Sequence, residues 1–147
     1  MAPGCGTPGY DQYICTVCGY TYADGFQSAL ECASEDFVDV SADAWFHEAV
    51  DYVVSEGIMN GLDDTHFGPA ATANRAQVVT VLYRMAGSPA VQGELPFVDV
   101  KDGDWFHDAV LWAVENGITN GVDATHFGPA AGCNRAQVVT FLYRAYN

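Results

Sequence analysis

Four of the five cysteines lie near the N-terminus, at spacings that suit a metal site. Cys15 and Cys18 form a CxxC pair followed by Gly19, a knuckle in which two thiolates can point at one ion. With Cys5 and Cys32 they offer the four thiolates of a tetrahedral zinc site. In an extracellular protein the same cysteines can instead form two disulfides, and CxxC can also be a redox pair. The sequence leaves these three chemistries open.

Two arginines form a second arrangement that could bind a ligand. Arg75 and Arg135 each lie in the sequence NRAQ, where Asn is a strong helix N-cap and Gln completes a variant of the capping box. An arginine in the first helical turn adds a bidentate grip on carboxylates where backbone amides already attract anions. A cation there is otherwise unfavourable. We therefore expect a partner, either an anionic ligand or a buried salt bridge to Asp39 and Asp99.

Trp45 and Trp105 are the aromatic residues that can stack on a sugar face. Their position at the start of a helical pattern favours the core over a stacking role. The histidines also occur in pairs, and we interpret His66 and His126 as exposed loop residues rather than metal ligands. No Ser–His–Asp set with supporting context and no phosphate-cradling glycine loop is found in the sequence. We therefore predict a protein that is not an enzyme.

These residues belong to a tandem repeat. Trp45 returns 60 positions later as Trp105, and residues 65–84 return with few changes as residues 125–144. Each copy is too short to bury a core alone, so we expect the copies to pack on each other.

Each copy is predicted to contain an extended FVDV piece, a helix, a loop and a second helix. An acidic turn before the first helix is expected to cap it. Gly57 and Gly117 are expected to end that helix in the left-handed conformation, followed by Ile58 and Ile118 as the apolar contacts. The loop is expected to be ordered around Phe67 and Phe127. Tyr10, Tyr13, Tyr20 and Tyr22 favour a short antiparallel hairpin at the N-terminus. The predicted divisions are a cysteine-rich hairpin (1–36), repeat 1 (37–87), a linker (88–96) and repeat 2 (97–147).

The repeat resembles the S-layer homology (SLH) repeat. The FxDV opening, the Trp and AV of the first helix, the GI-x-x-G step, the F-x-P loop and the RA[EQ] start of the second helix carry this resemblance over residues 37–147. It implies a mainly α fold, in which two helix-loop-helix repeats form an incomplete pseudo-threefold bundle. It also implies noncovalent anchoring of exported proteins to secondary cell-wall polysaccharide, often through pyruvylated sugars.

The N-terminal segment is similar to small repeats of Gram-positive surface proteins. The stretch TPGYDQYICTVCGYTYADGFQSAL carries this resemblance, and Cys32 falls near the position where those repeats have His. This supports Cys32 as a fourth ligand.

The net charge of the chain argues against two classes of partner. The net charge is −14, with 19 acidic and 5 basic residues, which argues against binding nucleic acid or anionic membranes. No apolar run is long enough to span a bilayer, and no signal peptide is visible.

The leading hypothesis is an extracellular module of a bacterial cell wall or S-layer that binds wall polysaccharide. Its predicted ligand-binding residues are Arg75, Arg135, Trp45, Trp105, Asp39 and Asp99. Two alternatives remain: a self-assembling surface unit that contacts other copies of itself, and a small metal-binding or redox module centred on CxxC.

Overall fold

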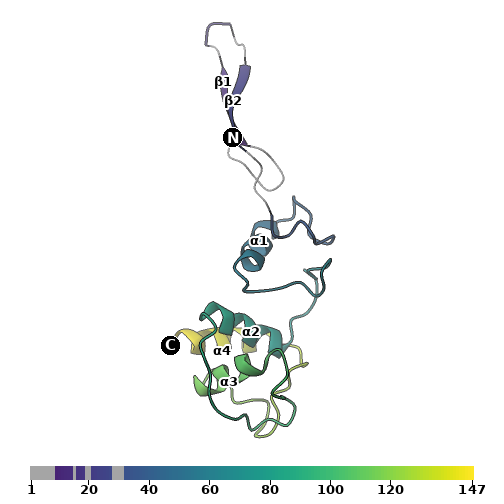
Figure 1. The fold of residues 1–147 in the computed structure, drawn as a ribbon, viewed down its shortest axis with the longest axis vertical. Coiled ribbons are helices and arrows are strands. Elements are labelled where there is room, and N and C mark those ends of the chain that lie inside the picture. Colours follow the sequence, from purple (N-terminus) through teal and green to yellow (C-terminus); the bar gives the residue numbers. More distant parts are fainter. Residues whose placement is uncertain (1–8, 15, 19–20, 28–31) are drawn as a thin grey trace. The chain divides into compact units, whose positions relative to one another are not determined.

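The computed structural model describes residues 9–14, 16–18, 21–27 and 32–147. It contains a two-stranded sheet and four helices, so its described part is mainly helical, as predicted (Figure 1). The chain divides into two compact units, Met1–Pro69 and Ala70–Asn147. We describe each unit by itself.

The first unit begins with a β-hairpin. Strands β1 (Gly9–Ile14) and β2 (Thr21–Gln27) are antiparallel, with Tyr13 opposite Tyr22 and a shift of register near Asp11. The predicted hairpin is thus confirmed. Tyr20 lies outside the described residues.

Helix α1 (His47–Ser55) follows the FVDV segment of repeat 1. This segment forms a turn, with the amide of Val40 donating to the carbonyl of Phe37, so the predicted extended piece is wrong. The amide of Val38 donates to the carbonyl of Thr65, and the carboxylate of Asp39 bonds to the same loop. The chain turns here because the amide of Val38 and the carboxylate of Asp39 both form hydrogen bonds with the loop that contains Thr65 and Phe67.

Helices α2 (Arg75–Met85), α3 (His107–Glu115) and α4 (Arg135–Tyr146) gather in one body in the second unit (Figure 1). Helix α2 packs mainly on α3, and more lightly on α4. This unit buries the apolar side chains Ala76, Val79, Leu82, Phe97, Val100, Ala109, Val110, Trp112, Ala113, Ile118, Phe127 and Phe141. Repeat 2 and the second helix of repeat 1 therefore share one core, as expected for copies that cannot fold alone.

The ends of the helices confirm some predictions and correct one. Asn74 and Asn134 cap α2 and α4 with complete capping boxes, and Gly57 and Gly117 adopt φ angles of +65° and +68°. The first helices of both repeats, however, have Phe at the N-cap and no side-chain cap. In repeat 2 the carboxylate of Asp104 instead accepts a hydrogen bond from the amide of Lys101 and closes the preceding turn.

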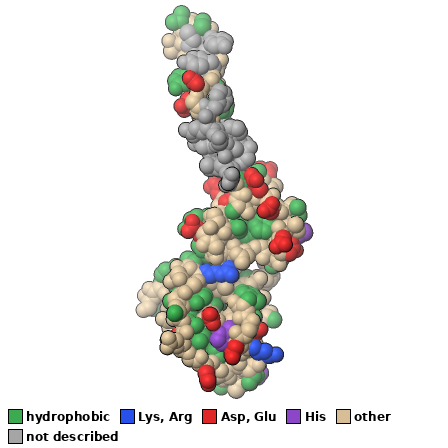
Figure 2. Space-filling view, in the orientation of Figure 1, with side chains coloured by type: hydrophobic (Ala, Val, Ile, Leu, Met, Phe, Trp, Pro, Cys, Tyr) green, Lys and Arg blue, Asp and Glu red, His purple; other side chains and the backbone are tan. Residues whose placement is uncertain are grey.

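The surface is acidic. The face drawn in Figure 2 carries scattered Asp and Glu side chains and few Lys or Arg side chains, in accord with the net charge of −14. Among the described residues, no helix has the length and apolar character needed to span a bilayer.

Candidate functional site

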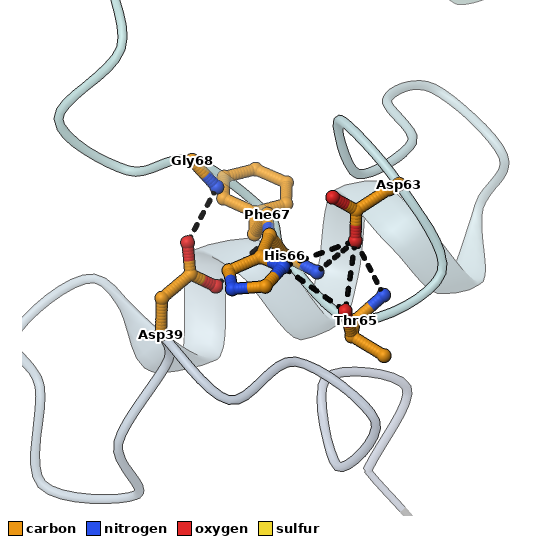
Figure 3. A network of polar contacts seen from close by, with 6 residues as sticks. All are labelled: Asp39, Asp63, Thr65, His66, Phe67 and Gly68. Carbon is orange, nitrogen blue, oxygen red and sulfur yellow. Dashed lines mark hydrogen bonds and ion pairs between the residues drawn. The ribbon is translucent and has the colours of Figure 1, made fainter.

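Asp39 and Asp99 organise the same loop in each repeat. In repeat 2 the carboxylate of Asp99 accepts hydrogen bonds of 2.8 Å from the amides of both Phe127 and Gly128. Asp39 makes the equivalent pair of bonds in repeat 1, as Figure 3 shows. Burial raises the pKa of Asp99, but the backbone amides outweigh this effect and lower it overall. Both aspartates therefore act as ionised staples of the loop.

A second acid closes the turn just before this loop. The carboxylate of Asp63 accepts hydrogen bonds from the amide of Thr65 and the amide of His66, both at 2.8 Å (Figure 3). The ring of exposed His66 lies 3.1 Å from the same oxygen. In repeat 2 the carboxylate of Asp123 likewise accepts a hydrogen bond from the amide of Thr125 at 2.8 Å, and the ring of His126 lies 3.1 Å from the same oxygen. Hydrogen bonds from the amide and hydroxyl of Thr65, together with His66, lower the pKa of Asp63 from 3.8 to about 2. This His is thus an exposed loop residue, as predicted.

Arg75, the first residue of α2, is buried with 3% of its surface exposed. Its Nε donates to the carbonyl of Phe127 at 2.9 Å, and its Nη2 donates to the hydroxyl of Thr119 at 3.3 Å. Its guanidinium also lies 4.9 Å from the ring centre of Phe127 and 5.3 Å from that of Phe141. Burial lowers the pKa of Arg75.

These contacts replace the predicted salt bridge in the second unit. The peptide of Phe127 lies between the two charges, because its amide donates to Asp99 and its carbonyl accepts from Arg75. Arg75 and Asp99 therefore do not pair directly, and one peptide group satisfies both residues. The sequence could not show this, because the carbonyl of Phe127 belongs to no side-chain pattern.

The backbone at the start of α2 is also satisfied from within the unit. The amide of Arg75 donates to the carbonyl of Ala131 at 2.9 Å, and the amide of Ala76 donates to that of Pro129 at 3.1 Å. Both acceptors belong to repeat 2. The anion-attracting amides at this helix start are thus occupied by carbonyl oxygens.

Arg135 occupies the equivalent position in α4 but is exposed. In the part of the chain that the structure describes, no acceptor bonds to its guanidinium or to the backbone amides of Arg135 and Ala136. The start of α4 therefore presents a cation and unsatisfied amides to solvent. This difference separates two residues that the sequence presents as equivalent.

The tryptophans are exposed, so the prediction that favoured a core position is wrong. Trp45 and Trp105 are 93% and 62% exposed, and each lies edge-on to the next residue, Phe46 or Phe106. The ring of Phe106 packs against the core of the second unit, whereas both tryptophan side chains are mostly exposed.

The predicted zinc ligands are only partly described. Cys5 and Cys15 lie outside the described residues, Cys18 is free and exposed, and Cys32 is disulfide-bonded. Zinc therefore stays a prediction.

The sulfur of Cys32 lies near two other metal-ligand side chains, those of His47 and Asp51. Their ligand atoms all lie within 4.8 Å of one another, and His47 Nε2 is 3.2 Å from Asp51 Oδ2. Metal ligation by Cys32 requires a thiolate, so its disulfide would first have to be reduced.

Sequence reasoning missed Thr119 and Phe141 as partners of Arg75. Thr119 replaces Met59 of repeat 1, and Phe141 replaces Val81. The only sign of these partners in the sequence is that the two copies differ at both positions. Thr119 and Phe141 belong to repeat 2, whereas the arginine that they contact belongs to repeat 1.

Comparisons with known proteins match the repeats. The model of the S-layer homology domain matches residues 36–79 and 96–139. The chain is 35% identical over 111 residues to the Surface-layer 125 kDa protein of Lysinibacillus sphaericus, covering 76% of the chain and 9% of that protein. It is 25% identical over 142 residues to S-layer protein EA1 of Bacillus anthracis, covering 96% of the chain and 16% of that protein.

The chain is also similar to a relative that carries the name of an enzyme. Exoglucanase XynX of Acetivibrio thermocellus is 30% identical over 124 residues, which cover 83% of the chain and 11% of that protein. The chain thus spans a small part of each relative.

Proposed function

Because the chain belongs to the S-layer homology family, we propose that it is a non-catalytic module that anchors its protein to the cell surface by binding wall polysaccharide. Its S-layer relatives support the cell-surface role. Pyruvylated sugars are the proposed ligand, because their ketal group carries a carboxylate. The two repeats are proposed to follow an incomplete pseudo-threefold arrangement.

The single observation that carries the proposal is the open start of α4. Arg135 is an exposed cation on a chain of net charge −14, and it lies beside backbone amides that no described residue occupies. A guanidinium and helix amides together fit a carboxylate, which can accept two parallel N–H bonds. This geometry supports the proposal of an anionic sugar over a neutral one.

The exposed tryptophans support a carbohydrate ligand. Trp105 belongs to the same unit as Arg135, and more than half of its surface is exposed. Exposed indole rings offer apolar faces against which a sugar ring can pack. We assign Trp105, and Trp45 in the first unit, to stacking.

We propose different roles for the other predicted residues. Arg75 is buried and bonded to Phe127 and Thr119, so we assign it to holding helix α2 against repeat 2. Asp39 and Asp99 hold the loops. We therefore propose that Arg135 makes the charged contact with the ligand and that these three residues position the scaffold.

Binding to purified pyruvylated wall polysaccharide tests the proposal. We expect Arg135→Gln to weaken binding at least tenfold, and we expect removal of the pyruvyl groups to weaken wild-type binding similarly. Lys101→Gln is the matched control, because it removes one exposed positive charge from the same unit. Equal binding by wild type and Arg135→Gln would contradict the assignment.

A further inference from the structure

The side chains of Cys32, His47 and Asp51 bring a sulfur, a nitrogen and an oxygen together inside the first unit. Their ligand atoms all lie within 4.8 Å of one another. His47 and Asp51 are four residues apart in helix α1, so they share one face of the helix. The amide of Ser34 donates to Asp51 Oδ1 at 2.9 Å, which holds the segment after Cys32 against this face. The other oxygen, Asp51 Oδ2, lies 3.2 Å from His47 Nε2.

The imidazole of His47 is buried without a hydrogen-bond partner. Its side chain is 8% exposed, and neither ring nitrogen forms a hydrogen bond with any residue that the structure describes. The contact of Nε2 with Asp51 is short but lacks hydrogen-bond geometry. The buried hydroxyl of Ser34 is unpartnered in the same way. Buried polar atoms are costly unless an ion, a water or another polar group satisfies them. The cluster therefore points to a ligand.

Repeat 2 shows that the fold does not require this cluster. Its equivalent histidine, His107, has a carboxylate partner, because Nδ1 lies 2.9 Å from Asp108 Oδ1. Leu111 occupies the position equivalent to Asp51 and is buried. An apolar residue thus serves at this position of the helix. The carboxylate beside His47 is a feature of repeat 1, and packing alone does not explain it.

We propose that Cys32, His47 and Asp51 form a redox-controlled site for one zinc ion, which binds after the disulfide of Cys32 is reduced. Thiolate, imidazole and carboxylate are all zinc ligands, and three protein ligands leave a fourth position for water. Ligand atoms about 2.0–2.3 Å from one zinc ion are roughly 3.3–3.8 Å apart. The 3.2 Å pair of His47 and Asp51 has nearly this spacing. The site differs from the predicted four-cysteine site, which shares Cys32 but uses neither His47 nor Asp51.

The disulfide of Cys32 is the switch. A dithiol reductant supplies two electrons and two protons, so the S–S bond breaks, both cysteines become thiols, and the two sulfurs of the reductant join in a disulfide. The Cys32 thiol then releases its proton to water as its thiolate binds zinc. Reversal of this exchange removes the sulfur ligand and releases the metal. The site is therefore open under reducing conditions and closed under oxidising ones, and it does not rest on the proposed glycan function.

Binding of Co²⁺ to the full 147-residue chain tests the site, because Co²⁺ replaces zinc and its thiolate-to-metal absorption reports a cysteine ligand. The chain is reduced with a dithiol, which is then removed under nitrogen. We expect the reduced wild type to bind Co²⁺ through a thiolate and to release it to Zn²⁺. The oxidised wild type should bind at least about tenfold more weakly, as should reduced His47→Gln and reduced Asp51→Asn. Asp51→Asn keeps the size of the side chain and an acceptor for Ser34, so it tests ligation even if His47→Gln does not fold.

The matched control is His107→Gln, which removes the equivalent histidine from repeat 2. Its reduced form should bind Co²⁺ like the reduced wild type. Reduced wild type that binds no Co²⁺ would overturn the proposal. Binding that survives unchanged in both His47→Gln and Asp51→Asn would also overturn it, and would leave the cysteines alone as the ligands. Equal binding by the oxidised and reduced wild type would contradict the control by the disulfide.

Discussion

Helices α2 and α4 begin with the same four residues, NRAQ, but their arginines lie in opposite environments. Arg75 is 3% exposed and bonded to Phe127 and Thr119, whereas Arg135 is exposed. Both helices have the same capping box, so the helix start itself is not the cause. What differs is the segment that covers it, because residues of repeat 2 close over the start of α2. The role of this arginine is therefore set by the neighbouring repeat.

The loops before the second helices show the opposite behaviour. Asp39 and Asp99 make the same pair of 2.8 Å bonds, and Asp63 and Asp123 close the same turn. All these partners lie within one repeat. These loop contacts inside a repeat are thus reproduced in both copies, whereas the contacts of Arg75 with repeat 2 are not repeated at Arg135.

The largest expected effect comes from the phenylalanine beneath Arg75. Phe127 is fully buried and Phe67 is half-buried. We expect Phe127→Ala to lower the free energy of unfolding of the second unit by about 3–5 kcal/mol, because it leaves a cavity in the core. Phe67→Ala should cost the first unit less. Urea unfolding followed by tryptophan fluorescence measures both, and equal losses would mean that the two loops are equally buried.

The next largest difference in stability is expected between substitutions of the two equivalent arginines. Arg75→Ala leaves the carbonyl of Phe127 without its donor, so we expect a loss of about 2–3 kcal/mol in the free energy of unfolding. Arg135→Ala removes an exposed side chain and should change that energy by less than about 0.5 kcal/mol. Thermal and urea unfolding of both variants check this. A larger loss for Arg135→Ala would reverse the assigned roles.

The sequence was sufficient where a pattern acts locally. The capping boxes at Asn74 and Asn134 and the left-handed Gly57 and Gly117 were predictable, because capping and backbone preferences act within a few residues. The hairpin was predictable in the same way, from clustered tyrosines around a turn.

The roles of the candidate site residues were less predictable. Identical NRAQ sequences cannot reveal that only one arginine is covered, because the cover comes from residues more than forty positions away. Trp105 looked like a core residue because helical spacing identifies a face but not whether anything packs on it. The partners of Asp99 could not be predicted, because they are backbone amides, which every sequence contains.

The smallest expected effect is a pH dependence of stability, which both repeats should show. The pKa of Asp63 and that of Asp123 are each lowered from 3.8 to about 2. Because the folded state prefers the ionised form, this stabilisation is fully present above about pH 4. It is lost as the pH falls toward 2.

Single substitutions separate the two copies in this pH range. Asp63→Asn should flatten the pH dependence of the first unit's stability between pH 4 and 2. The pH dependence of the second unit's stability should stay unchanged. Asp123→Asn should do the reverse. Unfolding midpoints measured across this range check the prediction, and an unchanged slope in both variants would contradict it.

Labelling with an arginine-specific dicarbonyl reagent tests most directly whether the two equivalent arginines differ. At a concentration where the chain is monomeric, peptide mass spectrometry should find Arg135 modified rapidly and Arg75 protected until the second unit unfolds. Pyruvylated wall polysaccharide should slow the labelling of Arg135 alone. Equal labelling of Arg75 and Arg135 in the folded protein, or no protection of Arg135 by saturating polysaccharide, would contradict the account.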